Sequence, residues 1–228
     1  MKTNKTHTAG LIAGAVALSL VASSAQAQLG QLGQLRGLVP GVGGGNAASY
    51  SPDAFLAETA QTTQMMMIAA VALRAASDER ENREQYRARI TQLNGSTNVG
   101  ELNAHKAAFQ EDLQALSANA AEAEVWQTRF DGASSDQRSL MLNAAFNFSL
   151  AMVRNVRLAQ QAPTLVNNIA RNPMMLTKLG QLRAAAELIM IQTNAARSMW
   201  TPMRAIMAKG GVAEPQDSSS TQPRAVEI

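Results

Sequence analysis

The sequence predicts an all-α protein built as an elongated up-and-down bundle of about four long helices, with a flexible N-terminal arm and a disordered C-terminal tail. Aromatic residues make up only 4% of the chain and no cysteine occurs. Ala, Leu, Gln, Arg and Met are frequent instead, and these residues favour helix over strand. Helix start and stop signals also divide residues 51–210 into a few long segments with short connections, which favours antiparallel neighbours.

The first 27 residues have the pattern of a secretory leader. Two lysines precede the apolar run Leu11 to Ala22, and Ala25-Gln26-Ala27 has the small-x-small pattern of a signal peptidase site. Cleavage is predicted between Ala27 and Gln28, so we expect a periplasmic or secreted protein. The apolar run is shorter than the ~30 Å hydrocarbon core of a bilayer requires. We therefore do not expect an integral membrane protein after cleavage.

Residues 28–50 are predicted to form a flexible arm, because glycines interleave with its leucines and disfavour a stable helix. Four leucines recur at three-residue spacing, which is unusual in a pure linker. They are Leu29, Leu32, Leu35 and Leu38. The arm therefore also suits docking into an apolar groove, either on a partner or on the bundle itself.

Four long helices are predicted from capping residues at their starts and from glycine, asparagine or proline at their ends. Their expected bounds are 51–93 with a break near Ser77, 98–132, 134–162 ending or bending before Pro163, and a last helix from Asn172-Pro173 to Gly210, with a short helical turn at 164–170. Asn98 with Glu101, and Ser134 with Gln137, have the spacing of capping boxes. Prolines and a serine run predict a disordered tail over residues 211–228.

Charge is distributed unevenly along the chain. Residues 50–136 contain 7 basic and 13 acidic residues, whereas residues 137–210 contain 9 basic residues and one acid. We expect acidic and basic helices to pair along the rim of the bundle. Two alternatives are a basic stripe of Arg183, Arg197 and Arg204 that meets an anionic surface, and self-association of unlike ends. Without the two leader lysines, 18 basic and 17 acidic residues leave a charge of +1, so no nucleic-acid partner is predicted.

Methionine is the residue type most suggestive of a binding site. Met199, Met203 and Met207 share one face of the last predicted helix. Such a face usually belongs to the core, because Met fills irregular gaps. The functional alternatives are a soft-metal site for Cu(I) on these three residues, or a pliable apolar surface for unfolded clients that also uses Met65-Met66-Met67. No resident cofactor is expected.

No catalytic site is predicted. His105, the one histidine after the leader, follows Glu101 by four residues, and the two are interpreted as a surface pair. Residues 78–89 are interpreted as a solvated helix face, and Glu111-Asp112 as surface acids. The sequence contains no nucleophile motif and no phosphate-binding glycine loop, so we do not expect an enzyme.

The function predicted from these observations is that of a non-catalytic bacterial envelope protein. It would act through its helical surface as an interaction, scaffold or assembly component, with a protein partner or by self-association. The alternative is a periplasmic chaperone, or a ligand or copper carrier, that uses the Met-rich faces. Export, the lack of an active-site motif and the leucine-bearing arm favour the first function.

Overall fold

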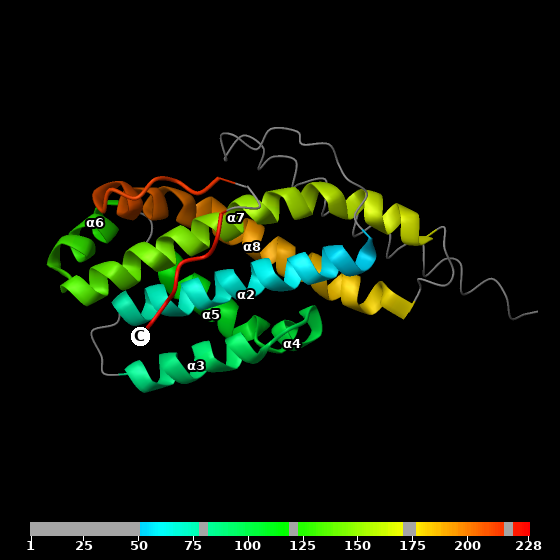
Figure 1. Cartoon of the computed structure of the whole chain (residues 1–228), viewed down its shortest axis with the longest axis horizontal. Helices are drawn as coiled ribbons and strands as arrows, with labels where there is room; N and C mark the ends of the chain where they lie inside the picture. The colour runs from blue at the N-terminus through cyan, green and yellow to red at the C-terminus, as the bar shows by residue number, and fades with distance from the viewer. Residues whose placement is uncertain (1–50, 78–81, 119–122, 171–176, 217–220) are drawn as a thin grey trace, which may run out of the picture.

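The computed structural model describes residues 51–77, 82–118, 123–170, 177–216 and 221–228. Within these residues the protein is all-helical, with seven α-helices and no strand, which confirms the predicted fold class. The helices are α2 (Pro52–Ser77), α3 (Arg83–Gly95), α4 (Val99–Ala104), α5 (Lys106–Ala118), α6 (Ala123–Gly132), α7 (Ser135–Ala170) and α8 (Leu179–Lys209). The three longest, α2, α7 and α8, run along the long axis of the molecule (Figure 1).

The central helix is α2, which packs against α3, α4, α5, α7 and α8. In its run Met65–Leu73 every residue except Ile68 is buried. A helix that is apolar around most of its circumference is expected in the middle of a core. Its N-terminus is capped as predicted, since Ser51 Oγ accepts a hydrogen bond of 3.2 Å from the N–H of Ala54.

The helix predicted over residues 51–93, with a break near Ser77, is two antiparallel helices, α2 and α3, which lie side by side (Figure 1). Gln64 of α2 fixes the end of α3, because its Nε2 donates to the carbonyls of Leu93 at 2.8 Å and of Ser96 at 3.0 Å. Carbonyls at a helix C-terminus lack their intrahelical partners, so a donor from a neighbouring helix satisfies them. The predicted break near Ser77 is thus a reversal of the chain, and the bundle of four long helices is not confirmed.

The helix predicted over residues 98–132 is divided into α4, α5 and α6. Its predicted capping box is present: the N–H of Glu101 donates to Asn98 Oδ1 at 3.0 Å, and the Glu101 carboxylate accepts from the N–H of Thr97 at 2.6 Å. His105 lies in the turn between α4 and α5. These two helices pack against α2 and α8, whereas α6 packs against α7 and α8.

α7 continues through Pro163, so the helix does not end there, which was one of the two predicted outcomes. A proline inside a helix removes one main-chain hydrogen bond, but Ala162 and Leu165 on either side are buried, and α7 packs against both α2 and α8. Tertiary packing therefore offsets the local penalty. The predicted capping box at the start is present, with the N–H of Gln137 donating to Ser134 Oγ at 3.3 Å and the N–H of Ser134 donating back to Gln137 Oε1 at 3.0 Å.

Polar side chains join α2, α7 and α8 inside the core. Gln192 Nε2 donates to Thr63 Oγ1 at 2.8 Å, and Asn155 Nδ2 donates to Thr193 Oγ1 at 3.1 Å and to the Ile189 carbonyl at 3.2 Å. All four polar side chains are buried. Because these directional bonds form in only one alignment of the helices, they select the register of the apolar seams around them.

The end of α8 is closed by glycine, as predicted. Gly211 has φ +68°, in the left-handed region that favours glycine. The N–H of Val212 then donates back to the Met207 carbonyl at 2.8 Å, which closes the last turn of the helix. The start predicted at Asn172-Pro173 lies outside the described residues, and α8 begins at Leu179.

Candidate functional site

Residues Thr221–Ile228, which we call the strap, lie as an extended segment on the surface of the bundle. The strap crosses α7 and α2 and ends beside α3 (Figure 1). Side chains of α7 and α3 bind its main chain, so the prediction of a disordered tail over residues 211–228 is not confirmed for this part. Closer to α8, Pro215 is also buried.

Three polar side chains of α7 bind the main chain of the strap. Asn147 is the centre of the contact: its Nδ2 donates to the carbonyl of Arg224 at 2.8 Å, and its Oδ1 accepts from the N–H of the same residue at 2.8 Å. Asn143 Nδ2 donates to the Ala225 carbonyl at 2.9 Å. Arg154 Nη2 donates to the Thr221 carbonyl at 2.8 Å.

The spacing of Asn147 and Arg154 matches that of an extended segment running antiparallel to this part of α7, before the strap crosses to α2. Seven helical residues separate Asn147 from Arg154, which is ~10 Å at 1.5 Å per residue. Their partners, Arg224 and Thr221, are three residues apart, which is also ~10 Å at 3.3 Å per residue. Asn143 and its partner Ala225 do not keep this spacing, because four helical residues (~6 Å) stand against one strap residue (~3.3 Å), so the match is limited to the segment from Thr221 to Arg224.

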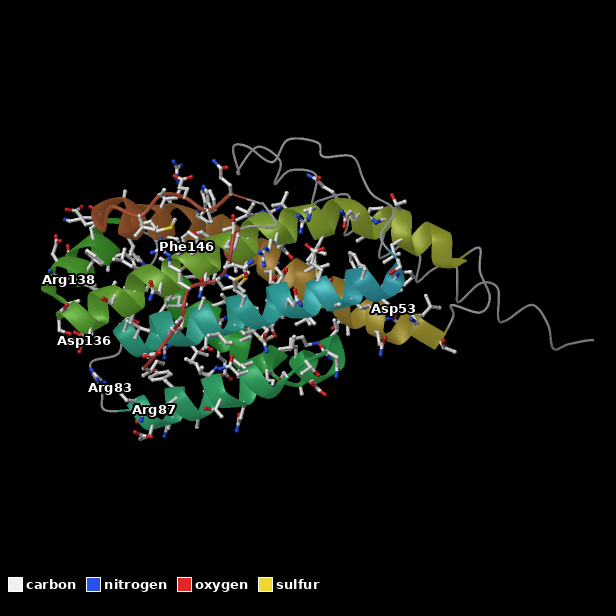
Figure 2. The ribbon with its side chains drawn as sticks, in the orientation of Figure 1. Asp53, Arg83, Arg87, Asp136, Arg138 and Phe146 are labelled. Atoms are coloured by element: carbon white, nitrogen blue, oxygen red, sulfur yellow. The ribbon has the colours of Figure 1, made fainter. Side chains whose placement is uncertain are left out.

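Three side chains of the strap add contacts of their own. The Arg224 guanidinium carbon lies 4.3 Å from the centre of the Phe146 ring, a cation–π contact. Val226 and Ile228 are half-buried and pack against the hydrophobic core. Figure 2 labels Phe146 on α7, which the strap crosses, and Arg87 on α3, beside which the strap ends. Arg87 donates through Nη2 to the Ile228 carbonyl at 2.7 Å.

Sequence reasoning missed this site, which we call the α7 face and which consists of Asn143, Phe146, Asn147 and Arg154. Two signals could have found it. Val226 and Ile228 stand on either side of Glu227, at the two-residue period of an extended segment. The two asparagines and Arg154 stand at positions i, i+4 and i+11, so they lie on the same side of the helix.

A second candidate site is a cavity of about 220 Å³ between α2, α3 and α5. Met67 and Phe109 belong to its apolar wall, and Arg89, His105 and Asp112 to its polar side. Asp112 is only 5% exposed and accepts a hydrogen bond from Arg89 Nη1 at 3.1 Å. The prediction that Asp112 is a surface acid is therefore wrong, and Arg89 joins α3 to α5 instead of belonging only to a solvated face.

His105 lies at this cavity, whereas the carboxylate of Glu101 bonds to Thr97. The surface pair predicted between His105 and Glu101 is thus not found among the described contacts. That bond to the Thr97 N–H is the main cause of a lowered pKa for the Glu101 carboxyl group. Across the described residues, no group of three or more His, Asp and Glu side chains is arranged to hold a metal ion.

The methionines considered for copper or for client binding lie in the core. Met199, Met203 and Met207 are each 0% exposed. On α2 the run Met65-Met66-Met67 is also buried. Their thioethers fill the space between packed helices, as the packing interpretation of the methionines predicts. Copper or a client could reach these sulfur atoms only if the helices separated.

Ion pairs join the acidic and basic parts of the chain along the rim of the bundle, as the charge distribution predicts. They are Glu58 with Arg157, Asp53 with Lys178, and Asp131 with Lys209. The predicted basic stripe of Arg183, Arg197 and Arg204 is exposed on α8. Arg204 pairs with Glu214, so the stripe has one of its three charges partly neutralised.

The leader and the arm, with Leu29, Leu32, Leu35 and Leu38, lie outside the described residues. In the part of the chain that the structure does describe, no helix combines the length and the apolarity needed to cross a membrane. No family model, curated protein or solved structure matches this chain.

Proposed function

We propose that this chain is a non-catalytic, exported interaction component of the bacterial envelope, which binds a protein partner through the surface of its helical bundle. The observation that carries the proposal is the α7 face, where Asn143, Asn147 and Arg154 hold an extended polypeptide by its main chain. The leader pattern of residues 1–27 supports export, with cleavage between Ala27 and Gln28.

Side chains that bind a main chain are a general means of recognising peptides, because they fit the backbone while neighbouring pockets choose side chains. On α7 these donors stand beside Phe146, which is 8% exposed and contacts Arg224. The surface thus combines polar groups that fix an extended segment with an aromatic ring that favours a cation. The arm at residues 28–50 supplies a second proposed contact, through its leucines.

The test is capture of envelope proteins on the immobilised mature chain, followed by direct binding measurements between the purified chain and each captured protein. A chain lacking residues 28–45 is compared in parallel, to assign each partner to the arm or to the bundle. We expect at least one captured protein to bind the purified mature chain directly, and to bind equally well when residues 28–45 are missing. If no captured protein binds in the purified pair, the proposal is wrong.

A further inference from the structure

Recognition at the α7 face is directed mostly at the main chain of its occupant. Asn143, Asn147 and Arg154 all bond to main-chain atoms of the strap, at Thr221, Arg224 and Ala225. Every polypeptide carries the same carbonyl and N–H groups, so these bonds would form with any extended segment of suitable side chains.

Asn147 is a buried polar side chain that is positioned to bind a main chain. This side chain is 4% exposed, and both ends of its amide are committed to the main chain of Arg224. A buried amide is unfavourable without hydrogen-bond partners. Departure of the strap would expose this amide to water, and water would replace the two hydrogen bonds until another extended segment binds there.

The side chains of the strap define what else such a segment must carry. Arg224 stacks on Phe146, and Val226 and Ile228 are half-buried against the core. The intervening Ala225 and Glu227 are exposed. An occupant in place of the strap thus carries a cation over Phe146 and, two and four positions later, apolar residues that pack on the core beyond α7, which is the alternation of an extended chain.

The strap is held in a way that permits its release. Val226 and Ile228 are only half-buried, and the hydrogen bonds to the Ala225 and Ile228 carbonyls lie at the exposed surface. Segments with little buried apolar area and exposed hydrogen bonds open at the low end of the local stability range. The strap is tethered to the bundle, so its effective concentration at the face is in the millimolar range. A segment of another chain must compete with the strap at that concentration.

We infer, building on the proposed interaction function, that the α7 face is a binding site for an extended segment of another polypeptide. That segment carries Arg or Lys followed by apolar residues two and four positions later, and it replaces the strap. The strap is then an intramolecular competitor that keeps the face covered until such a partner is present.

The first experiment uses the full-length mature chain with Val226→Ser and Ile228→Ser, which loosens the strap without removing it. The probe is a labelled peptide, Ser-Thr-Pro-Lys-Ser-Leu-Ser-Leu, which shares with the strap only its proline and the cation-x-apolar-x-apolar pattern. We expect it to bind the double variant at least ~10-fold more tightly than the wild-type chain, where the tethered strap competes. The matched control, Ala225→Ser with Glu227→Ser, changes two exposed strap positions and should behave as wild type.

Two further probes test the recognition itself. A peptide with both leucines moved by one position should bind the double variant at least ~10-fold more weakly, because its apolar side chains would face solvent. Adding Asn143→Ala to the double variant should also weaken binding. Asn143 is only half-buried, so this change tests the face without a large change in the core, and thermal unfolding checks that the fold is retained.

Two outcomes would overturn the inference. In the first, a peptide with the strap's own sequence binds but the designed peptide does not, which would mean that the face is specific for the strap. Light scattering of the wild type would then show whether that strap comes from the same chain, in a monomer, or from a second copy, in a dimer. Absence of binding by either peptide to the double variant would mean that the face takes no segment in trans. In that case, a partner captured equally well by the wild-type and double-variant chains would bind at another surface, and the proposed interaction function would still hold.

Discussion

α2 and the strap are held on the same bundle by opposite means. Most residues of α2 are buried, and neighbours on most sides pack on its methionine, alanine and leucine side chains. The strap is mostly exposed, and side chains of α7 and α3 bind it through its main-chain oxygens. Apolar burial is non-directional and strong, whereas a hydrogen bond exchanged with water is directional and contributes only ~1 kcal/mol net.

The difference separates the part of the molecule that maintains the fold from the part suited to recognition. An element such as α2 cannot leave without exposing the core. A segment such as the strap can exchange with solvent or with a competing peptide at small free-energy cost. Substitutions that move from α2 outward should therefore change from global to local effects.

The largest effect is expected for Met66→Ala in α2. Met66 is 0% exposed, so its truncation leaves a cavity and should lower the free energy of unfolding by about 2–5 kcal/mol. Denaturant unfolding followed by circular dichroism measures the change. Gln61→Ala, at an exposed position of the same helix, is the control and should change stability by less than about 0.5 kcal/mol. Equal losses in both variants would contradict the central position of α2.

The second-largest loss of stability is expected for substitution of Asp112, a buried carboxylate at the edge of the core. Asp112→Ala leaves Arg89 without its carboxylate partner, but the Arg89 side chain is 33% exposed and can reach water. We therefore expect a loss of about 1–3 kcal/mol, below that for a fully buried ion pair. Glu111→Ala, at the exposed neighbouring position, should cost much less. A loss from Asp112→Ala no larger than that control would show that the pair adds nothing to the fold.

Changes at the α7 face should act on the strap more than on the whole molecule. Asn147→Ser removes the acceptor for the Arg224 N–H, so hydrogen exchange at that amide should become at least ~10-fold faster. Amide exchange followed by NMR measures this directly. Asn194→Ser, at an exposed position of α8, is the control and should leave the Arg224 amide unchanged. Unchanged exchange in the Asn147 variant would mean that the strap does not depend on this contact.

Glu101 should give a small pH dependence, confined to the start of α4. The Thr97 N–H lowers the pKa of its carboxyl group below the ordinary value of 4.5. A carboxylate with a lowered pKa in the folded state stabilises it above the unfolded pKa, and this contribution disappears as the pH falls through the folded pKa. Glu101→Gln should therefore reduce the loss of stability on acidification below about pH 4.5. An identical pH profile in wild type and variant would contradict this assignment.

The smallest effect is expected for the arginines exposed on α8. Arg183→Glu and Arg197→Glu should each change stability by less than about 0.5 kcal/mol. Juxtamembrane basic residues contribute ~1 kcal/mol each at an anionic membrane surface, and Arg204 already pairs with Glu214. We therefore expect vesicles with acidic headgroups to capture little protein even at low salt. Strong capture that high salt and these two substitutions abolish would instead support the anionic-surface alternative.

Local signals in the sequence were sufficient for the fold class and for several helix ends. Ser51, the Asn98–Glu101 pair and the Ser134–Gln137 pair each form the predicted cap, because these bonds join residues three positions apart and depend on no distant element. The buried run of α2 was visible in the same way. The number of long helices was not, because the reversal after Ser77 and the turn at His105 are stabilised by contacts between helices.

The candidate site shows the same division between local and distant contacts. The residues of the strap lie about 70 to 80 positions after their partners on α7, and no local pattern records which surface an extended segment will contact. The sequence around Asp112 likewise has the pattern of a surface acid. Arg89 reaches Asp112 only because α3 and α5 both pack on α2.

The sequence by itself determined that this protein is helical, where several of its helices are capped, and which helix faces are apolar, since each property follows from neighbours within a few residues. Only the tertiary structure decided that α2 lies at the centre, that α7 runs through Pro163, and that the strap lies on the α7 face. The physical reason is that burial and main-chain hydrogen-bond partners arise between segments far apart in the chain. Their free energies override local propensities that differ by only ~1–3 kcal/mol.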